Sequence, residues 1–349
     1  MKHQSTPQIL LGPDSLQQLP ALLEGHKVLL VHAHRPVEDG LLEQVRVLLT
    51  SHHIQHENLG QILPNPKYRS VKRGIRHCRR TDCDFILSLG GGSTLQCARG
   101  IALGVRFKGD IRSFWTGKSR PGKALPVACV LTNPATGDEL TDACTLVLKG
   151  KQRTIHAPQA ACRFAILDPR LSILPWYPTM NQGFALYVRA FAAALSSREP
   201  DLTACVDVMK RVLECIRSLS TDLSDLEARS ALFEAGVLSH KLKSTDPTGF
   251  IQLAQDLAFA CSLPEGTALS SLFPAWLHSL ARTDNERLET IARLVYGNGT
   301  DLLTQTSQLL GDMKLAGSLP EAGLSLSRKE LKSFTDSRYL QKILLAANK

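Results

Sequence analysis

The stretch that decides the fold runs from Asp84 to Gly100 and reads DFILSLGGGSTLQCARG. Its first part, Asp84–Leu89, is mostly apolar and is typical of a strand buried on both faces of a parallel sheet. Gly90–Ser93 follows as a turn, and a helix is expected over Thr94–Leu103. A tight turn alone would explain the glycines. A strand before them and a helix after them favour a phosphate site, because the start of a helix presents free N–H groups to an anion.

The same alternation of strand and helix extends through the first half of the chain. Short apolar runs are separated by segments with helical spacing, and the turns between them are short. This order predicts a parallel α/β sheet. The other strands are expected at Gln8–Leu11, Lys27–His32, Ile54–Leu59, Leu125–Leu131 and Phe164–Leu167.

The character of the sequence changes after Asp168-Pro169. Beyond this point no segment is a convincing strand, and apolar residues recur at the period of a helix. We therefore expect two domains, an α/β dinucleotide-binding domain over residues 1–168 and an all-helical domain over residues 169–349. The expected helices of the second domain are Met180–Ser197, Leu202–Ser218, Asp225–Leu242, Gly249–Ala260, Thr267–Arg282, Asn285–Tyr296 and Arg328–Ala347.

The composition is that of a globular protein. The chain has 349 residues, of which 43% are hydrophobic, and its glycine and proline content is ordinary. No apolar run reaches the roughly 18 residues of a membrane-spanning helix, and no apolar signal core follows Met1. We therefore expect a soluble, cytoplasmic protein without a membrane partner. The nine cysteines form no C-x-x-C pair, which favours reduced thiols over a zinc site or disulfides.

Positive charge gathers in one segment of the chain. Seven basic residues lie in Lys67–Arg80, and no acidic residue lies between Glu57 and Asp82. At helical spacing these side chains share one face opposite an apolar face, which predicts an amphipathic helix. A solvated helix face is the preferred interpretation. A surface for nucleic acid is the less favoured alternative, because no aromatic residues interleave the charges. The basic face comprises Arg69, Lys72, Arg73, Arg76 and Arg80.

The glycine turn also carries a resemblance to a known family. GGGSTLQCARGIA, from Gly90 to Ala102, resembles the G-G-G-S-x-x-D-x-A-K-x-[IA] signature of the iron-dependent (group III) alcohol dehydrogenases, in their aldehyde-reductase and butanol-dehydrogenase branch. The resemblance implies a dehydroquinate synthase-like architecture, in which a cleft between an α/β and a helical domain holds NAD(P) and a divalent metal. Further motifs agree in order and spacing, namely Pro64-Asn65-Pro66, the T-x-x-A-T-G-S-E-like loop Thr132–Glu139, Ile166–Pro169, and Pro264-x-Gly266 followed by Phe273-Pro274.

For the cofactor, the resemblance implies a pyrophosphate turn with polar residues around the nucleotide. Three positions depart from the family pattern, because Gln96 replaces Asp, Arg99 replaces Lys and Asp138 replaces Ser. The turn after the first long strand contains Arg35, which suits the 2′-phosphate of NADP, so NADP is preferred over NAD. The candidate cofactor-binding residues are Arg35, Asn65, Gly91, Gly92, Ser93, Gln96, Thr132 and Thr136.

For the metal, the resemblance implies one Asp and three His as ligands. One carboxylate among the four positions cannot hold a catalytic ion, which needs about three protein ligands and an open position. We therefore expect no metal and no Lewis acid. The residues at the four ligand positions are Ala185, Arg189, Ile251 and Glu265, and Gln255 stands where a further active-site His is expected.

The candidate catalytic residues are therefore Arg189, Glu265 and Gln255. We expect the Arg189 guanidinium to pair with Glu265, so that its positive charge stands roughly where the metal cation was. A purely structural pair is the preferred interpretation. The alternative is that one guanidinium N–H polarises a carbonyl group and supports a weak metal-independent reductase.

Three functions remain open on the sequence. The first is an NAD(P)-dependent alcohol or aldehyde oxidoreductase by descent, acting on a small molecule without metal or no longer active. The second is a pseudoenzyme kept as a nucleotide-binding or protein-interaction module. The third is a nucleic-acid-associated protein that uses the Lys67–Arg80 face. The resemblance also implies a homodimer, with the strand Gln8–Leu11 at or near the contact.

Overall fold

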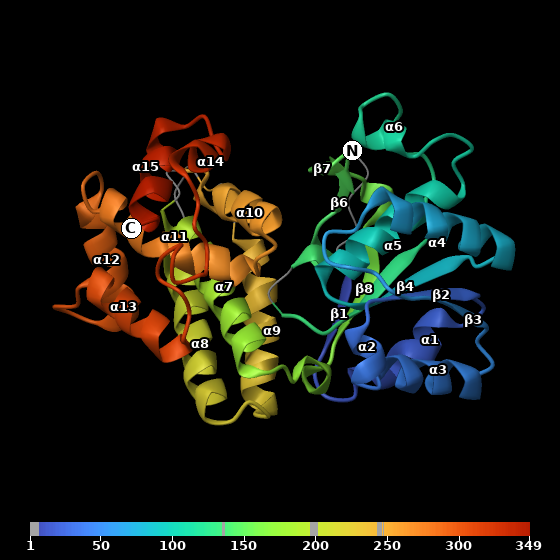
Figure 1. Ribbon diagram of the computed structural model, residues 1–349. Helices are drawn as coiled ribbons and strands as arrows, with labels where there is room; N and C mark the ends of the chain where they lie inside the picture. Colours follow the sequence, from blue (N-terminus) through green and yellow to red (C-terminus); the bar gives the residue numbers. More distant parts are fainter. Residues whose placement is uncertain (1–6, 135–136, 196–201, 243–245, 247) are drawn as a thin grey trace. The chain divides into compact units, whose positions relative to one another are not determined.

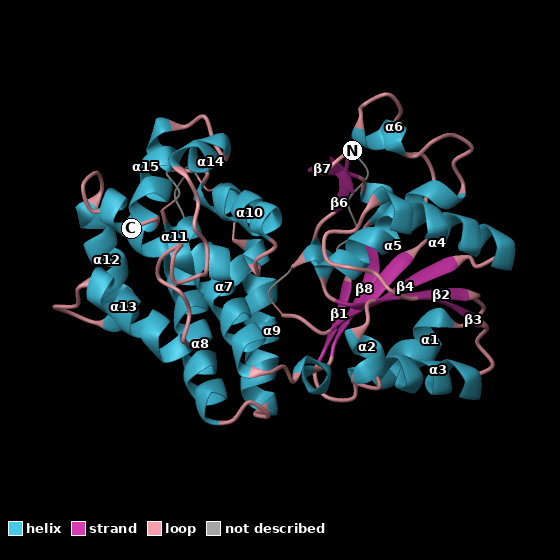
Figure 2. Ribbon diagram, viewed as in Figure 1, coloured by secondary structure: helices cyan, strands magenta, loops and turns pink. Residues whose placement is uncertain are grey.

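The computed structural model describes residues 7–134, 137–195, 202–242, 246 and 248–349. The chain divides into two compact units, Met1–Ser172 and Ile173–Lys349 (Figure 1). Within the described residues, the first unit contains all the strands and the second is built from helices (Figure 2). This confirms the predicted combination of a parallel-sheet unit with a helical unit.

Six parallel strands form the sheet of the first unit, in the order β1-β8-β5-β4-β2-β3. The central strands β2, β4 and β5 are buried along their whole length, as their continuous apolar runs predict. The observed strands differ from the expected ones by at most two residues at an end. Their bounds are β1 (Gln8–Leu11), β2 (Val28–His32), β3 (His56–Leu59), β4 (Phe85–Gly90), β5 (Val127–Leu131) and β8 (Cys162–Leu167).

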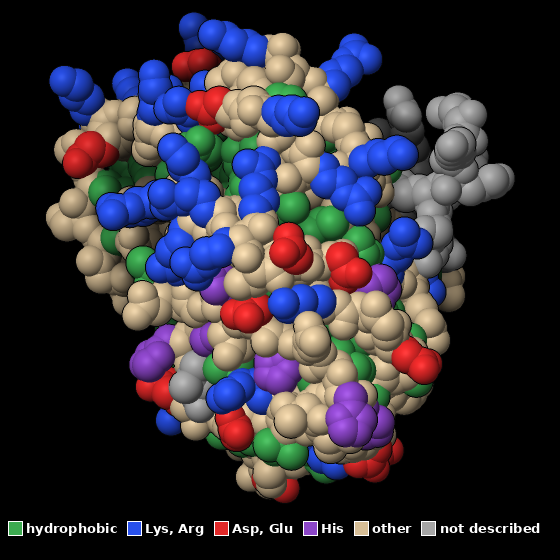
Figure 3. All heavy atoms as spheres, turned by 90° about the vertical axis from the view of Figure 1, so that its right-hand side faces the viewer, with side chains coloured by type: hydrophobic (Ala, Val, Ile, Leu, Met, Phe, Trp, Pro, Cys, Tyr) green, Lys and Arg blue, Asp and Glu red, His purple; other side chains and the backbone are tan. Residues whose placement is uncertain are grey.

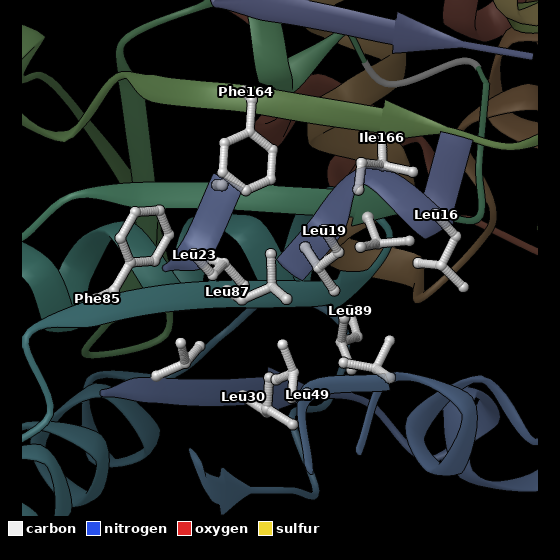
Figure 4. Close-up of a cluster of buried hydrophobic side chains, with 14 of the residues drawn as sticks. Leu16, Leu19, Leu23, Leu30, Leu49, Phe85, Leu87, Leu89, Phe164 and Ile166 are labelled. Carbon is white, nitrogen blue, oxygen red and sulfur yellow. The ribbon is translucent and has the colours of Figure 1, made fainter. Parts of the chain in front are cut away.

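Helices cover both faces of this sheet. Helices α4 (Tyr68–Thr81) and α5 (Gly92–Val105) lie on one face, and α1 (Leu19–Leu23) and α3 (Leu41–Ser51) lie on the other (Figure 1). Alternate strand residues point to opposite faces, so every second side chain joins a core with α1 and α3 (Figure 4). Burying each of its leucines contributes about 1.5–3 kcal/mol. The labelled residues of this core are Leu16, Leu19, Leu23, Leu30, Leu49, Phe85, Leu87, Leu89, Phe164 and Ile166.

The strand order places a ligand site at one edge of the sheet. Strand β3 lies on one side of β2, and β4 lies on its other side, so the direction of the strand order reverses between β2 and β4. In open α/β sheets, ligands bind outside the carboxyl ends of the strands at such a point. Strand β4 ends at Gly90, so the glycine turn lies at this edge.

A two-stranded hairpin in the first unit was not predicted. Strands β6 (Ala143–Leu148) and β7 (Lys151–His156) pair antiparallel around Lys149 and Gly150. Both turn residues have positive φ, 49° and 75°, as a tight two-residue hairpin turn requires. Strand β7 is polar and largely exposed, so it lacks the apolar alternation that identifies a strand in a sequence.

The second unit packs its helices around α7 (Trp176–Ala194), which is almost wholly buried. Its core is aromatic, and the rings of Phe250 and Trp276 stack with centroids 4.0 Å apart. No helix among the described residues combines the length and apolar character needed to cross a membrane. The other helices are α8 (Leu202–Thr221), α9 (Leu226–Lys241), α10 (Phe250–Cys261), α11 (Glu265–Leu280), α12 (Asn285–Tyr296), α13 (Leu302–Met313), α14 (Arg328–Ser333) and α15 (Arg338–Ala347).

Two details of the helical unit correct the sequence prediction. The single helix expected over Arg328–Ala347 is two helices, because Ser337 caps α15 by accepting a hydrogen bond from the backbone of Leu340. Helix α13 was not predicted, although Asp301 caps it by accepting from the backbone N–H of Thr304. In both places a polar side chain at a helix start, rather than the apolar period, sets the boundary.

We predict that Gly74→Ala destabilises the protein. Gly74 lies where α4 meets α5, and a Cβ there would lie 2.6 Å from Cγ1 of Ile101 and 2.8 Å from Cδ2 of Leu59. Overpacking of a core costs about 1–3 kcal/mol, which exceeds the gain of up to about 1 kcal/mol in helix propensity. The urea midpoint of unfolding, followed by circular dichroism, should fall.

Gly311→Ala is the matched control, because Gly311 also lies in a helix and a Cβ there meets nothing within 4 Å in the described chain. Its midpoint should stay unchanged or rise. Equal midpoints for the two variants would contradict the close packing of α4 on α5.

Candidate functional site

The glycine turn between β4 and α5 is shaped for a close approach to the backbone. Gly90 has a φ of 138°, a conformation that residues with a side chain rarely adopt. Gly91 is the N-cap residue of α5, with a φ of −95°. A Cβ on Gly91 would have only Cβ of Asn133, at 3.8 Å, within contact distance among the described residues. As far as the structure describes the chain, the first turn of α5 has open space beside Gly91, and its N–H groups and dipole favour an anion there.

Polar residues from three segments gather around this turn. The backbone N–H of Asn65 donates to Oγ of Ser93 at 3.2 Å. The backbone N–H of Thr132 donates to the carbonyl of Gly90, also at 3.2 Å. The structure thus brings Asn65 and Thr132 to the pyrophosphate turn, whereas Thr136 lies outside the described residues. Gln152 of β7 joins them, because its Nε2 donates to Oδ1 of Asn65 at 2.8 Å. No sequence pattern points to Gln152, because the hairpin that carries it has no recognisable strand signal.

Arg35 lies beside the same edge of the sheet. It begins the short helix α2 (Arg35–Glu38), which follows β2. The next residue, Pro36, has its Cγ 3.8 Å from the position of a Cβ on Gly90, so the two turns touch. The Arg35 guanidinium is half-exposed and donates from Nε to Oδ2 of Asp39 at 2.8 Å.

Gln96 and Arg99, the two residues of α5 that differ from the family pattern, both bind other parts of the first unit. Gln96 is buried, and its Oε1 accepts from the backbone N–H of Thr145 at 2.9 Å, which ties α5 to β6. Arg99 is fully buried and donates to several backbone carbonyls. Its acceptors are the carbonyls of Asp138 and Thr141 at 2.6 Å from Nη2, of Ala143 at 2.7 Å from Nη1, and of Ala160 at 3.2 Å from Nε.

Glu139 is a buried carboxyl group close to Arg99. It lies in the short 3₁₀ helix Asp138–Leu140 and is 3% exposed. Its Oε2 is buried and has no hydrogen-bond partner in the described part of the chain. Burial raises the pKa of Glu139 to about 7, and Asp138 adds to the rise while Arg99 opposes it.

In the helical unit, the residues at the family's metal-ligand positions meet in one cluster. Arg189 of α7 donates from Nη2 to Oε1 of Glu265 at 2.8 Å, which is the ion pair expected from the sequence. Gln255 of α10 donates from Nε2 to the same Oε1 at 3.2 Å. Ala185 lies one helical turn before Arg189, and Ile251 lies one turn before Gln255. Three helices thus bring Arg189, Gln255 and Glu265 together.

Glu265 is ionised in this cluster. Burial alone would raise the pKa of Glu265, but the Arg189 charge, the hydrogen bonds from Gln255 and Arg189, and the nearby His240 bring it below its ordinary value. His240 lies in α9 and completes the surroundings of the carboxylate. No spacing or motif in the sequence connects His240 with Glu265.

The donor set of this cluster does not fit the family's divalent metal. Ala185 and Ile251 carry no ligating atom, and Arg189 remains protonated, so it has no lone pair to offer. The one carboxylate already accepts from Arg189 and Gln255. No group of three or more His, Cys, Asp or Glu side chains in the described ranges is arranged to hold a metal ion.

We predict that Glu139→Gln stabilises the protein above about pH 7 and has little effect below about pH 4.5. The pKa of Glu139 is about 7 in the folded chain, above its ordinary value of 4.5. Between these values the folded state holds a proton that the unfolded state releases, so this group makes stability fall as pH rises. Melting temperatures of wild type and variant across pH 4–8 should therefore diverge with rising pH. The exposed Glu24→Gln should show no such trend.

Two family models match the chain. The model described as iron-containing alcohol dehydrogenase matches residues 6–169, and the model of the C-terminal part of the Fe-containing alcohol dehydrogenase family matches residues 190–348. The chain is 27% identical over 299 residues to the probable NADH-dependent butanol dehydrogenase 2 of Bacillus subtilis (strain 168), covering 81% of this chain and 76% of the relative.

Solved structures share the whole fold. The NADH-dependent butanol dehydrogenase A of Thermotoga maritima superposes with a TM-score of 0.88 at 18% identity, covering 99% of this chain and 97% of that one. The sulfoacetaldehyde reductase of Bifidobacterium kashiwanohense, solved in complex with NAD+, has a TM-score of 0.86 at 18% identity, covering 100% and 99%. Together with the two family models, these matches extend over both units, and the chain belongs to the iron-containing alcohol dehydrogenase family.

Proposed function

We propose that the protein is an NAD(P)-dependent alcohol or aldehyde oxidoreductase whose chemistry does not use the metal of its family. The observation that carries the nucleotide half is the Gly90–Ser93 turn, which lies between a buried strand and a helix at the switch point of the sheet. The related sulfoacetaldehyde reductase was solved with NAD+, and the related butanol dehydrogenases are named as NADH-dependent. Both support a nicotinamide cofactor for this chain.

In this proposal, the pyrophosphate lies over Gly91, Gly92 and Ser93. The start of α5 supplies N–H groups and the positive end of the helix dipole. Asn65 and Gln152 would shape the wall beside the pyrophosphate, because they are hydrogen-bonded to each other and to Ser93. Arg35 would pair with a 2′-phosphate, which favours NADP over NAD. Its guanidinium is bonded to Asp39, and the adjacent Pro36 touches the glycine turn.

The helical unit would contribute a fixed cation instead of a metal. Hydride transfer from a reduced nicotinamide to a carbonyl carbon leaves negative charge on the oxygen, which then takes a proton from water. A metal supplies positive charge for that oxygen in the family. In this proposal Arg189 takes the place of that cation. Glu265 accepts a hydrogen bond from Arg189, and Gln255 in turn donates to Glu265.

A second candidate function rests on the same ion pair. Glu265 is ionised beside Arg189, so the charge of the guanidinium is largely balanced within the cluster. Such a pair can serve to hold α7 against α10 and α11, because ion pairs with a purely structural role are common. The protein would then bind the nucleotide without turnover, as a sensor or interaction module.

We also propose that the protein forms a homodimer, with β1 at or near the contact. Strand β1 is an edge strand of the sheet in the part of the chain that the structure describes, and an edge strand can pair with a second chain.

We predict that Gly91→Val weakens binding of NADPH and NADH at least tenfold. The valine side chain would occupy the approach to the first turn of α5, whereas the free protein has room for it. Binding is measured by the fluorescence of the reduced nucleotide. Gly122→Val is the matched control, because a Cβ on Gly122 meets nothing within 4 Å in the described chain. Unchanged affinity in Gly91→Val, or no affinity in wild type, would contradict the nucleotide site.

We predict that the purified protein carries no stoichiometric divalent metal, and that EDTA leaves its turnover of an aldehyde such as butanal unchanged. Metal content is measured by inductively coupled plasma mass spectrometry. The control restores the family's ligand set in one variant carrying Ala185→Asp, Arg189→His, Ile251→His and Glu265→His. This variant should bind one equivalent of divalent metal.

The outcomes separate the two candidate functions. Turnover that survives EDTA supports the oxidoreductase, and it should fall when Arg189→Met removes the cation. Nucleotide binding without turnover supports the second candidate. One equivalent of metal in wild type, or turnover abolished by EDTA, would contradict the loss of the metal.

A further inference from the structure

The positive charge of the protein is concentrated in one part of the first unit. Residues 67–123 contain 14 Lys and Arg and only 3 Asp and Glu, a net charge of +11. The whole chain carries +9, so all other residues together carry −2. This charge plays no part in the nucleotide or metal-site proposals. So much positive charge in one sixth of the chain indicates a surface that attracts a negatively charged partner.

Helix α4 carries the first part of this charge on its outer side. Val71, Gly74, Ile75 and Cys78 are buried against the rest of the unit. The basic side chains of the helix are exposed, and they recur every three or four residues from position 69 to position 80. Side chains at this spacing lie about 5–6 Å apart, and 11 residues of helix span about 16 Å.

The loop after α5 lies along α4 and extends its basic face. At the C-terminal end of α4, Arg79 donates to the carbonyls of Gly104 at 2.9 Å, Val105 at 2.8 Å and Phe107 at 2.6 Å. At the other end, the hydroxyl of Tyr68 donates to Asp110 at 2.9 Å. The loop is therefore fixed to both ends of the helix, and its basic side chains extend the same surface.

We call the combined area the basic surface. It is visible as Lys and Arg side chains gathered over the upper half of the face in Figure 3, the half in which α4 and α6 (Arg112–Trp115) lie. The exposed residues that define it are Arg69, Lys72, Arg76 and Arg80 of α4 with Arg106 and Lys108 of the loop.

Little in the protein neutralises this surface. In the part of the chain that the structure describes, none of its six defining side chains lies in a salt bridge. Arg112, beside it, pairs with Asp110. These six cations therefore have no close carboxylate partner among the described residues. A polyanion that binds them would release counterions and gain from their release.

In the described chain, the region that carries the basic surface has no large exposed apolar side chain, which disfavours a membrane or a protein as the partner. None of the large apolar side chains exposed in the described chain lies within residues 67–123. A membrane would need apolar side chains to insert for firm attachment, and a protein partner would need an apolar interface core.

The aromatic rings that the structure describes in this region are half-buried or buried, and none is fully exposed. Arg112 lies over the ring of Tyr68 at 5.2 Å, and Phe107 packs on the buried Phe114 with centroids 4.6 Å apart. Single-stranded nucleic acid is usually held by bases stacked on exposed rings. The surface offers charge without such rings, which suits the regular phosphate backbone of a double helix.

We propose that the basic surface binds the phosphate backbone of duplex DNA without reading its sequence. On the sequence a solvated face was preferred, because no aromatic residues interleave the charges, but that argument applies to single strands rather than to a duplex. The structure adds the loop cations to the same surface and shows which rings are covered. Duplex DNA carries one charge per about 1.7 Å of axis, so about 16 Å of helix faces enough phosphates to engage four or five cations.

The test is fluorescence anisotropy of a labelled 30-base-pair duplex with the full-length protein between 50 and 200 mM KCl. Micromolar affinity is expected at the lowest salt, with a slope of log K against log salt of about −4. The double variant Arg69→Glu with Arg76→Glu should weaken binding at least tenfold and reduce the slope by about 2. Arg69→Gln with Arg76→Gln should act in the same direction, and circular dichroism checks the fold of each variant.

The matched control is Arg282→Glu with Arg293→Glu, two exposed arginines of the helical unit. It changes net charge by the same amount but should alter affinity less than twofold. Equal losses in both double variants would overturn the proposal, because net charge alone would then explain binding. No duplex binding at 50 mM KCl, tighter binding to a single strand, or binding to phosphatidylserine vesicles but not to DNA would overturn it as well.

Discussion

The buried guanidinium of Arg99 is the interaction on which the first unit depends most. It projects from α5, directly behind the glycine turn, and reaches backbone carbonyls of four residues between Asp138 and Ala160. Burying an ionised side chain costs several kcal/mol unless its N–H groups are satisfied. Four carbonyls offset that cost and fix the segments that follow β5. A lysine, as in the family pattern, has one nitrogen and could not serve carbonyls that lie around different edges of the planar guanidinium.

In both units, the residues that differ from the family pattern bind partners within the protein. Gln96 and Arg99 bind the protein's own backbone, and Arg189 and Glu265 bind each other. In each case a polar side chain at a position associated with cofactor or metal satisfies an internal partner. Such contacts preserve packing while changing what the site can do. These internal contacts hold the positions together by the protein's own hydrogen bonds and ion pair.

Local patterns in the sequence predict most of the fold, and long-range contacts explain what they miss. Continuous apolar runs identify β2, β4 and β5, since strands buried on both faces have no polar alternation. The polar strand β7 has no such signal. The glycine turn is recognisable because all its parts are consecutive. The contact between Gln152 and Asn65 joins residues 87 positions apart, and the carbonyl partners of Arg99 lie 39 to 61 positions from it, so neither follows from spacing alone.

Helix α4 packs closely against α5 on its inner side and carries positive charge on its outer side. Its inner side approaches α5 so closely that Gly74 has no room for a side chain, which fixes the distance between the helices. Its outer side is free of that constraint and carries most of the local charge. Arg73 and Arg79 belong to both sides, because they donate to carbonyls of Gly60 and of the loop after α5 while keeping their positive charge. Carbonyl acceptors anchor a guanidinium without neutralising it. The packing that holds α4 on the sheet therefore also maintains the electrostatic field of the face it presents to solvent.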